Sequence, residues 1–145
     1  MLKMNKSLRP VILDTHVWIW LVNGDKQMAT SHALDLIEKK AANQQVYVSI
    51  ISVWEVGMLD AKGKIDLPYS CQKWINKALN APGISLAQLT PEIVIHSTHL
   101  PGSFHGDPAD QMILATASNF QATLITKDKK MLNYAPKNKI KTLPL

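Results

Sequence analysis

The sequence has few cysteines, few acidic residues and no long apolar run, and each shortage excludes a class of protein. Its 145 residues contain one cysteine, Cys71, so an internal disulfide is excluded and a reducing cytoplasm is expected. No apolar run approaches the roughly 20 residues of a membrane span, so no membrane partner is expected. No signal-type segment follows the basic start MLKMNKSLR. We expect 1–9 to be a flexible basic N-terminus, unless translation begins at Met4, and 10–145 to be one domain.

Basic residues outnumber acidic ones, with 16 Lys and Arg against 11 Asp and Glu and a net charge of +5. Such an excess favours a polyanionic partner. It is strongest near the C-terminus, where six lysines and one acid lie between Lys127 and Lys141. This segment is either a solvated basic tail or a rim that binds phosphates. In the second interpretation Lys127, Lys129 and Lys130 contact RNA.

Short apolar runs alternate with segments of helical period. Helical patterns follow or separate the runs, and the tail holds a possible edge strand at 140–143. The alternation predicts an α/β fold, a three-layer α/β/α sandwich in one domain around a mainly parallel sheet. The four strand candidates are Pro10–Thr15, Val46–Ile50, Ile84–Leu89 and Ala122–Ile125.

Four acids fall where this architecture brings the chain to one edge of the sheet. Asp14 and Asp128 follow strand candidates, and Glu55 and Asp110 are expected in the first turns of helices. Because the carboxyl ends of parallel strands share an edge, the four carboxylates should converge. Converging carboxylates repel each other unless a cation lies between them. A set of oxygen ligands without cysteine suits Mg²⁺ or Mn²⁺ rather than zinc.

Each acid also has a purely structural interpretation. Asp14 is a favoured N-cap residue for the next helix. Ser52 and Glu55 have the spacing of a capping box, so a helix is expected to start there. Asp107 fits the N-cap of a helix that opens at Pro108, which places Asp110 at its third position.

Aromatic and histidine side chains offer further candidates. Trp18 and Trp20 could stack on bases, although at this spacing at least one should face the core. His96 and His99 could share a helix face, but no third ligand is spaced to complete a zinc set.

Four stretches resemble the PIN-domain ribonucleases, of the VapC toxin type found in bacterial toxin–antitoxin pairs. They are LDTHVWIW around Asp14, SIISVWEVGML around Glu55, HGDPADQMILATA around Asp110 and LITKDKKM around Asp128. The resemblance runs from about Val11 to Leu143. It implies an α/β/α sandwich that binds Mg²⁺ or Mn²⁺ through these four acids and cleaves RNA, such as tRNA or another structured RNA. It gives supporting roles to Asp107, Thr126, Ser52 and Thr15.

The resemblance also implies partners, namely a cognate antitoxin and a second copy in a homodimer. The chain departs from the family pattern at two positions. Related sequences often carry Phe at Ala109 and Arg at Gln111. The absent arginine removes one salt bridge or phosphate contact but leaves the metal ligands intact.

Two functions of other classes fit part of the pattern. A phosphatase or phosphotransferase could use Asp14 as a covalent nucleophile, yet His16 stands where that chemistry usually has a second aspartate. A non-catalytic RNA- or protein-binding module could have the same fold. Acids at all four positions argue against that second alternative.

Overall fold

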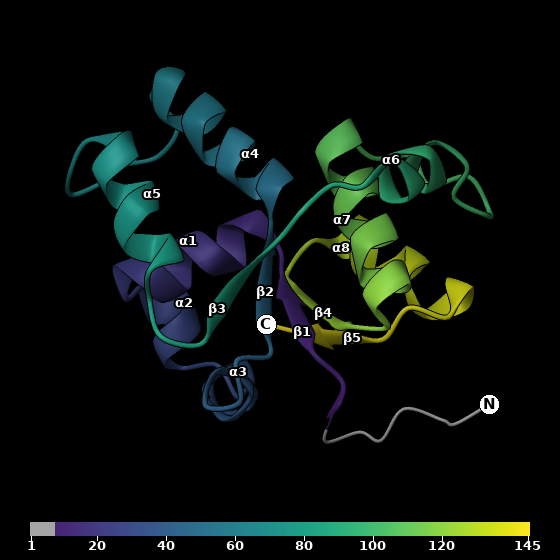
Figure 1. Cartoon of the computed structure of the whole chain (residues 1–145), viewed down its shortest axis with the longest axis horizontal. Helices are drawn as coiled ribbons and strands as arrows, with labels where there is room; N and C mark the ends of the chain where they lie inside the picture. Colours follow the sequence, from purple (N-terminus) through teal and green to yellow (C-terminus); the bar gives the residue numbers. More distant parts are fainter. Residues whose placement is uncertain (1–7) are drawn as a thin grey trace.

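The computed structural model describes residues 8–145 (Figure 1). Most of the basic N-terminus predicted at 1–9 therefore lies outside the described residues. Arg9 lies within them, and its Nη1 donates a 2.8 Å hydrogen bond to the carbonyl of Gln121. Within 8–145 no helix is long and apolar enough to cross a membrane.

Five strands form one parallel sheet in the order β3-β2-β1-β4-β5. The central strand pairs with a neighbour on each side, so that Leu13 lies opposite Val48 and Ile125. The predicted parallel sheet is confirmed, and the tail supplies its last edge strand. The strands are β1 (Val11–Leu13), β2 (Val46–Ser49), β3 (Ile84–Ala87), β4 (Thr123–Thr126) and β5 (Thr142–Pro144).

Helices cover both faces of this sheet, as Figure 1 shows. Helices α1, α2, α3 and α5 lie on one side, α6, α7 and α8 lie on the other, and α4 leaves the carboxyl end of β2. The predicted three-layer sandwich is confirmed. The bounds are α1 (Thr15–Asn23), α2 (Lys26–Ala29), α3 (Ala33–Ala41), α4 (Ile50–Ala61), α5 (Cys71–Leu79), α6 (Pro91–Thr98), α7 (Pro108–Phe120), α8 (Lys129–Tyr134) and the 3-10 turn η2 (Pro136–Asn138).

The alternation of side chains along each strand divides the core into two clusters. Val11 and Leu13 pack with Trp18 on the face that α1, α3 and α5 cover. Ile12, whose side chain points the other way, packs with residues of α7 and α8. Trp18 is fully buried and its ring lies 5.1 Å from that of Trp74, which confirms that one of the two early tryptophans faces the core.

The predicted start of α4 was wrong. The helix begins at Ile50, and its N-cap is Ser49, whose hydroxyl accepts a 3.1 Å hydrogen bond from the backbone N–H of Ile51. Ser52 lies inside the helix and is buried, so the capping box with Glu55 does not form. The extended backbone of Ser49 places its hydroxyl at the cap one turn earlier than the Ser52–Glu55 spacing suggested. Ser52 and Glu55, three residues apart, instead share the face toward α1.

Candidate active site

Asp14 lies directly after β1, in the middle of the sheet, and its side chain is 8% exposed. It is the N-cap of α1, because Oδ1 accepts a 2.8 Å hydrogen bond from the N–H of Thr15. Oδ2 accepts a second bond of 2.7 Å from the hydroxyl of Thr126 at the end of β4. Burial raises the pKa of Asp14, while these hydrogen bonds and nearby His16 lower it. Asp14 therefore has both roles: Oδ1 caps α1, and Oδ2 is held toward the end of β4 by Thr126.

Glu55 reaches the same place from α4 and is equally buried. Its Oε1 accepts a 2.5 Å hydrogen bond from the hydroxyl of Thr15, and the Thr15 oxygen also lies 2.8 Å from the hydroxyl of Ser52. Burial raises the pKa of Glu55, and the charges of Asp14 and Asp107 add to that rise. Thr15 thus holds both acids, one through its N–H and the other through its hydroxyl.

Asp110 enters from the first turn of α7. As predicted, Asp107 is the N-cap, with Oδ1 accepting a 2.9 Å bond from the N–H of Asp110, and Pro108 opens the helix. Burial, then the charges of Asp107, Asp14, Asp128 and Glu55, raise the pKa of Asp110 to about 8. The charges of four other acids therefore act on Asp110, and two of these acids, Asp107 and Asp128, line the same depression as Asp110 does.

Asp128 lies beyond the end of β4 and caps α8, with Oδ1 accepting a 3.0 Å bond from the N–H of Met131. Its own N–H donates a 3.0 Å bond to the Thr126 hydroxyl that also donates to Asp14. Asp128, Asp107 and Asp110 line an open depression of about 580 Å³ together with Lys129 and Lys130. Two of the lysines predicted to bind RNA therefore border the acids.

The other C-terminal lysines are distributed differently from the predicted rim. Nζ of Lys127 donates a 2.6 Å bond to Oε1 of Gln27 and lies 5.7 Å from the centre of the Trp20 ring. Lys137 lines a separate depression beside Tyr134. Lys139 and Lys141 line a cavity at the amino ends of β1, β4 and β5. The prediction of a single basic rim along 127–141 is wrong, because α8 and η2 carry the chain from the carboxyl ends of the strands to their amino ends.

The acid cluster fits a divalent cation as an open site. Among residues 8–145, no group of three or more His, Cys, Asp or Glu side chains is arranged so that it could hold a metal ion, so a cation would have to bind to fewer side chains and to water. The donors are all oxygens, and the pKa of Asp110 is raised first by burial and then by repulsion from neighbouring acids, which a cation would relieve. Mg²⁺ keeps several water ligands and needs only one or two carboxylates, so an open oxygen-only set suits it better than a closed cage does.

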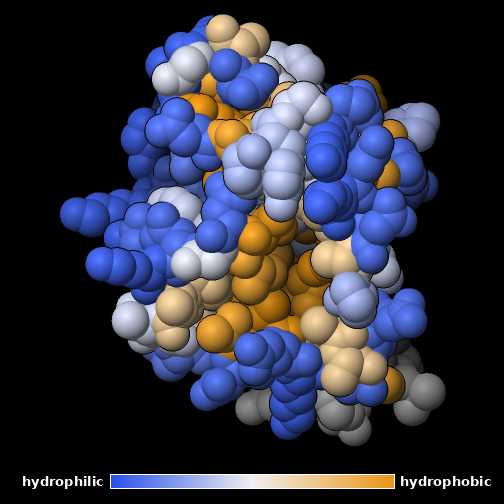
Figure 2. All heavy atoms as spheres, turned by 90° about the vertical axis from the view of Figure 1, so that its left-hand side faces the viewer, coloured by the Kyte–Doolittle hydropathy of each residue, from blue (hydrophilic) through white to orange (hydrophobic). Residues whose placement is uncertain are grey.

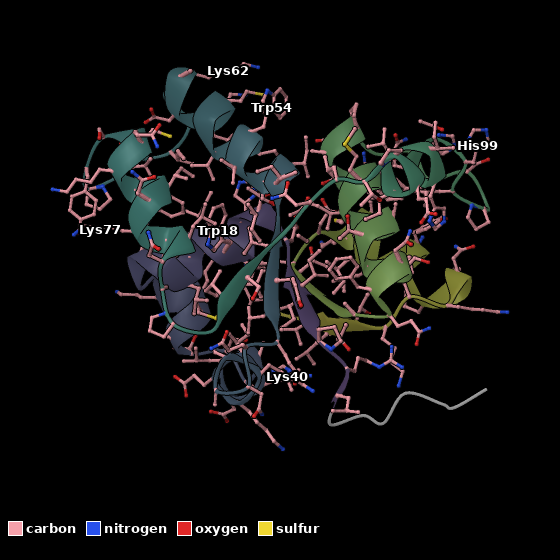
Figure 3. The ribbon with its side chains drawn as sticks, viewed as in Figure 1. Trp18, Lys40, Trp54, Lys62, Lys77 and His99 are labelled. Carbon is pink, nitrogen blue, oxygen red and sulfur yellow. The ribbon has the colours of Figure 1, made fainter. Side chains whose placement is uncertain are left out.

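Two features near the acids had no clear signal in the sequence. The exposed His16 lowers the pKa of both Asp14 and Glu55 through its charge. A cavity of about 380 Å³ lies beside Glu55 between α4 and α7, with Trp54 and Ala109 among its lining residues. Trp54 is 58% exposed (Figure 3). Helical periodicity places Trp54 on a surface, but only the packing of α4 beside α7 places that surface next to Asp107.

A large apolar cavity lies on the face of the domain that α1, α3 and α5 cover. Figure 2 shows the hollow in the middle of the face formed by α1, α3 and α5. It has a volume of about 870 Å³. Apolar side chains dominate its wall, among them Leu21, Val22, Ile37, Leu67 and Trp74. At its margin Tyr69 is 43% exposed, and Nζ of Lys77 lies 4.7 Å from the centre of its ring.

Comparisons with known proteins agree with this geometry. A family model described as PIN domain matches residues 11–137. Ribonuclease VapC22 of Mycobacterium tuberculosis (strain ATCC 25618 / H37Rv) is 31% identical over 126 residues, which are 86% of this chain and 91% of that protein.

Solved structures share the fold at lower identity. The VapBC2 complex from Rickettsia felis, bound to a promoter DNA fragment, gives a TM-score of 0.66 at 16% identity, covering 92% of this chain and 97% of that chain. DNA-bound VapBC from Salmonella typhimurium gives 0.67 at 15% identity, covering 94% and 98%. A toxin–antitoxin complex from Klebsiella pneumoniae gives 0.56 at 21% identity, covering 86% and 92%.

Proposed function

The chain belongs to the PIN-domain family, and from that premise we propose that it is a metal-dependent endoribonuclease, the toxin of a toxin–antitoxin pair. The observation that carries the proposal is Asp110, a carboxylate whose burial and four acidic neighbours together raise its pKa to about 8. Its nearly full-length similarity to a protein named as a ribonuclease supports the reaction. The toxin–antitoxin complexes among its structural neighbours support the biological role.

The four acids predicted from the sequence are the proposed metal ligands. Asp14, Glu55, Asp110 and Asp128 would hold Mg²⁺ or Mn²⁺ through oxygen atoms, with water completing the coordination. When bound, such an ion lowers the pKa of a water molecule and neutralises charge on the scissile phosphate. Asp107, as the N-cap of α7, fixes the backbone that presents Asp110.

The chain's own groups supply positioning and proton transfer. Thr126 and Thr15 fix both oxygens of Asp14, and Thr15 also fixes Oε1 of Glu55. Glu55 then accepts a proton from the attacking water as general base, in keeping with its raised pKa. The water oxygen bonds to phosphorus in line with the departing 3′-oxygen. That oxygen takes a proton from solvent, and the other product ends in a 5′-phosphate.

Basic side chains beside the acids would hold the RNA backbone. Lys129 and Lys130 line the depression that contains Asp110 and Asp128. Lys127 is held against Trp20 and Gln27, so its ammonium group is pre-positioned. Cations next to an acidic metal pocket attract the phosphates that flank the one being cleaved.

The apolar cavity between α1, α3 and α5 is the proposed docking surface for the antitoxin. The support for this placement is the apolar wall of the cavity, since large exposed apolar surfaces are typical of sites that bind a protein or another ligand. Such a partner would act in the cytoplasm, where RNA and antitoxin are both available. The homodimer implied by the family resemblance stays a prediction, and light scattering on the purified protein measures it.

The phosphatase alternative has no structural support. His16, not a second acid, lies two residues after Asp14, where that chemistry usually has an aspartate.

The proposed function is tested by incubating the purified protein with single-stranded RNA in Mg²⁺, in Mn²⁺ and in EDTA. Cleavage with either ion, none in EDTA, and product fragments with 5′-phosphate ends are the expected results. Metal binding without any cleavage would instead establish a non-catalytic module, and a trapped phosphoryl-aspartate would establish the phosphatase.

A further inference from the structure

A second charged cavity lies at the opposite edge of the sheet from the acid cluster. Its volume is about 710 Å³, and it is bounded by the amino ends of β1, β4 and β5, by α3 and by the segment after η2. Figure 3 shows its residue Lys40 on α3, at the end of the molecule opposite Trp54 on α4. We call it the amino-edge cavity. Four cations line it, Arg9, Lys40, Lys139 and Lys141, and none of its described lining residues is an Asp or Glu.

Two of these cations are built into the fold. Lys40 is only 7% exposed, although lysine is rarely buried to this extent. Arg9 is oriented by the bond from its Nη1 to the carbonyl of Gln121. Its Nε is buried and has no hydrogen-bond partner among residues 8–145. A buried donor of this kind is costly unless a ligand accepts from it.

The electrostatics of the cavity favour an anion. Burial lowers the pKa of Lys40, and the charges of Lys39 and Arg9 lower it further. Four cations with no described acid among the lining residues make the potential in the cavity positive, which favours a bound anion. Lys139 and Lys141 are more exposed and border the opening.

We propose that the amino-edge cavity binds a phosphate group. A guanidinium beside several ammonium groups matches the charge and the several acceptor oxygens of a phosphate better than it matches a single carboxylate. Thr123 and Thr142 also line the cavity, and their hydroxyls are further donors. The volume accommodates a whole nucleotide. The phosphate belongs either to the RNA backbone or to a free nucleotide or inorganic phosphate.

The site is independent of the nuclease chemistry. It lies at the amino ends of the strands, whereas Asp14, Asp110 and Asp128 gather at the carboxyl ends. Phosphate binding in the amino-edge cavity should therefore persist in Asp110→Asn and in EDTA. Failure of the proposed ribonuclease activity would leave this proposal standing, and the reverse also holds.

The test is calorimetric titration with inorganic phosphate in EDTA, at constant ionic strength set with chloride. The double variant Lys139→Gln with Lys141→Gln should bind phosphate roughly a hundredfold more weakly, about tenfold for each charge-assisted bond removed. The matched control is Lys62→Gln with Lys64→Gln, which removes two exposed charges at the far end of α4, where Figure 3 marks Lys62. Lys40→Met is a further variant, but it alters a buried position, so the exposed pair decides the result.

Three outcomes overturn the proposal: phosphate that binds the parent no better than chloride, an unchanged affinity in the Lys139/Lys141 variant, or an equal loss in the control pair.

The source of the phosphate is then resolved with a single-stranded oligoribonucleotide and with a mononucleotide, both in EDTA. If the RNA backbone is the ligand, inorganic phosphate competes with the oligonucleotide, and the variant has a shallower salt dependence of RNA binding than the control. If a free nucleotide is the ligand, the mononucleotide binds more tightly than phosphate and the salt dependence is unchanged.

Discussion

The hydroxyl of Thr126 at the end of β4 donates a 2.7 Å hydrogen bond to Oδ2 of Asp14 at the end of β1. β1 and β4 are neighbours in the centre of the sheet. From β1 the chain adds β2 and β3 on one side, and it then returns to add β4 and β5 on the other side. Open parallel sheets bind their ligands at such a topological switch point, where the strand order reverses. This bond therefore links the sheet topology directly to the orientation of a proposed metal ligand.

Removing this hydroxyl should weaken the site without removing any acid. Thr126→Val keeps the shape of the side chain but leaves Oδ2 of Asp14 without its donor. Metal affinity and cleavage should each fall roughly 10- to 100-fold, the usual effect of losing a group that orients a metal ligand. The measurement is a Mg²⁺ titration of single-turnover cleavage. Thr126→Ser is the matched control and should stay near the parent, whereas equal activity of the Val variant would show that Asp14 needs no such support.

The acid cluster should make the metal-free protein less stable as pH rises. Asp110 has a folded-state pKa of about 8, above its ordinary value of 3.8. Between these two values the unfolded chain has released a proton that the folded chain still holds, so the free energy of unfolding falls as pH increases. The change begins near pH 4 and levels off above about pH 8. Burial is the largest cause of this raised pKa, and the charges of Asp107, Asp14, Asp128 and Glu55 add to it.

Thermal unfolding in EDTA across this range measures the effect. Asp110→Asn should flatten the dependence, and Mg²⁺ should restore stability to the parent at high pH, because the ion binds only the folded cluster. A parent protein that grows more stable from pH 5 to pH 8 in EDTA would contradict this account of the acids.

The apolar cavity should be needed for neutralisation but not for catalysis. Val22→Glu places a charge on its wall, where a partner's apolar side chains would have to bury it. The variant should still arrest bacterial growth when expressed, while co-expression of the neighbouring antitoxin gene should no longer relieve the arrest. Ile95→Glu is the control, since Ile95 is 61% exposed on α6 and does not line this cavity. If co-expression of the antitoxin gene fully relieved the growth arrest caused by the Val22→Glu variant, the antitoxin would have to bind elsewhere.

Lys129 and Lys130 beside the acids, together with Lys127 at Trp20, should act on RNA binding alone. Changing Lys127, Lys129 and Lys130 together to Ala should weaken binding to all RNAs and reduce the salt slope by up to about 2 or 3, since each lost phosphate contact removes roughly 0.7 to 0.9 of a released counterion. Cleavage of fully bound RNA should survive. The pair Lys62→Ala and Lys64→Ala supplies the control for net charge. An unchanged salt slope in the triple variant would mean that the RNA follows another path.

The positions of the acids could be predicted because they follow local rules. A buried apolar strand that ends in Asp14, and the Asp107–Pro108 start of α7, each determine a side-chain position within a few residues. The parallel topology then brings these positions together. The start of α4 was missed because Ser49 and Ser52 are both acceptable caps by sequence, and the end of β2 decided between them.

The lysines could not be placed from sequence, because their location depends on the path of the chain after β4. Lys129 and Lys141 are twelve residues apart and look alike in a basic tail, yet they line cavities at opposite edges of the sheet. The hydrogen bond between Thr15 and Glu55 could not be predicted from local sequence patterns either, since it joins residues of two helices that are 40 positions apart in the chain.

The acids at the carboxyl edge of the sheet form the proposed metal-dependent ribonuclease site, and the variant Asp110→Asn is its sharpest test. This change removes the negative charge that Asp110 would carry when Mg²⁺ is bound, and it leaves every lysine in place. Single-turnover cleavage in Mg²⁺ should fall by more than about 100-fold, because losing a metal ligand costs more than losing an outer partner. RNA binding should be unchanged or tighter, since the pocket repels phosphate less. Asp60→Asn, an exposed acid at the far end of α4, should cleave like the parent. Cleavage by Asp110→Asn at the parent rate would contradict the account.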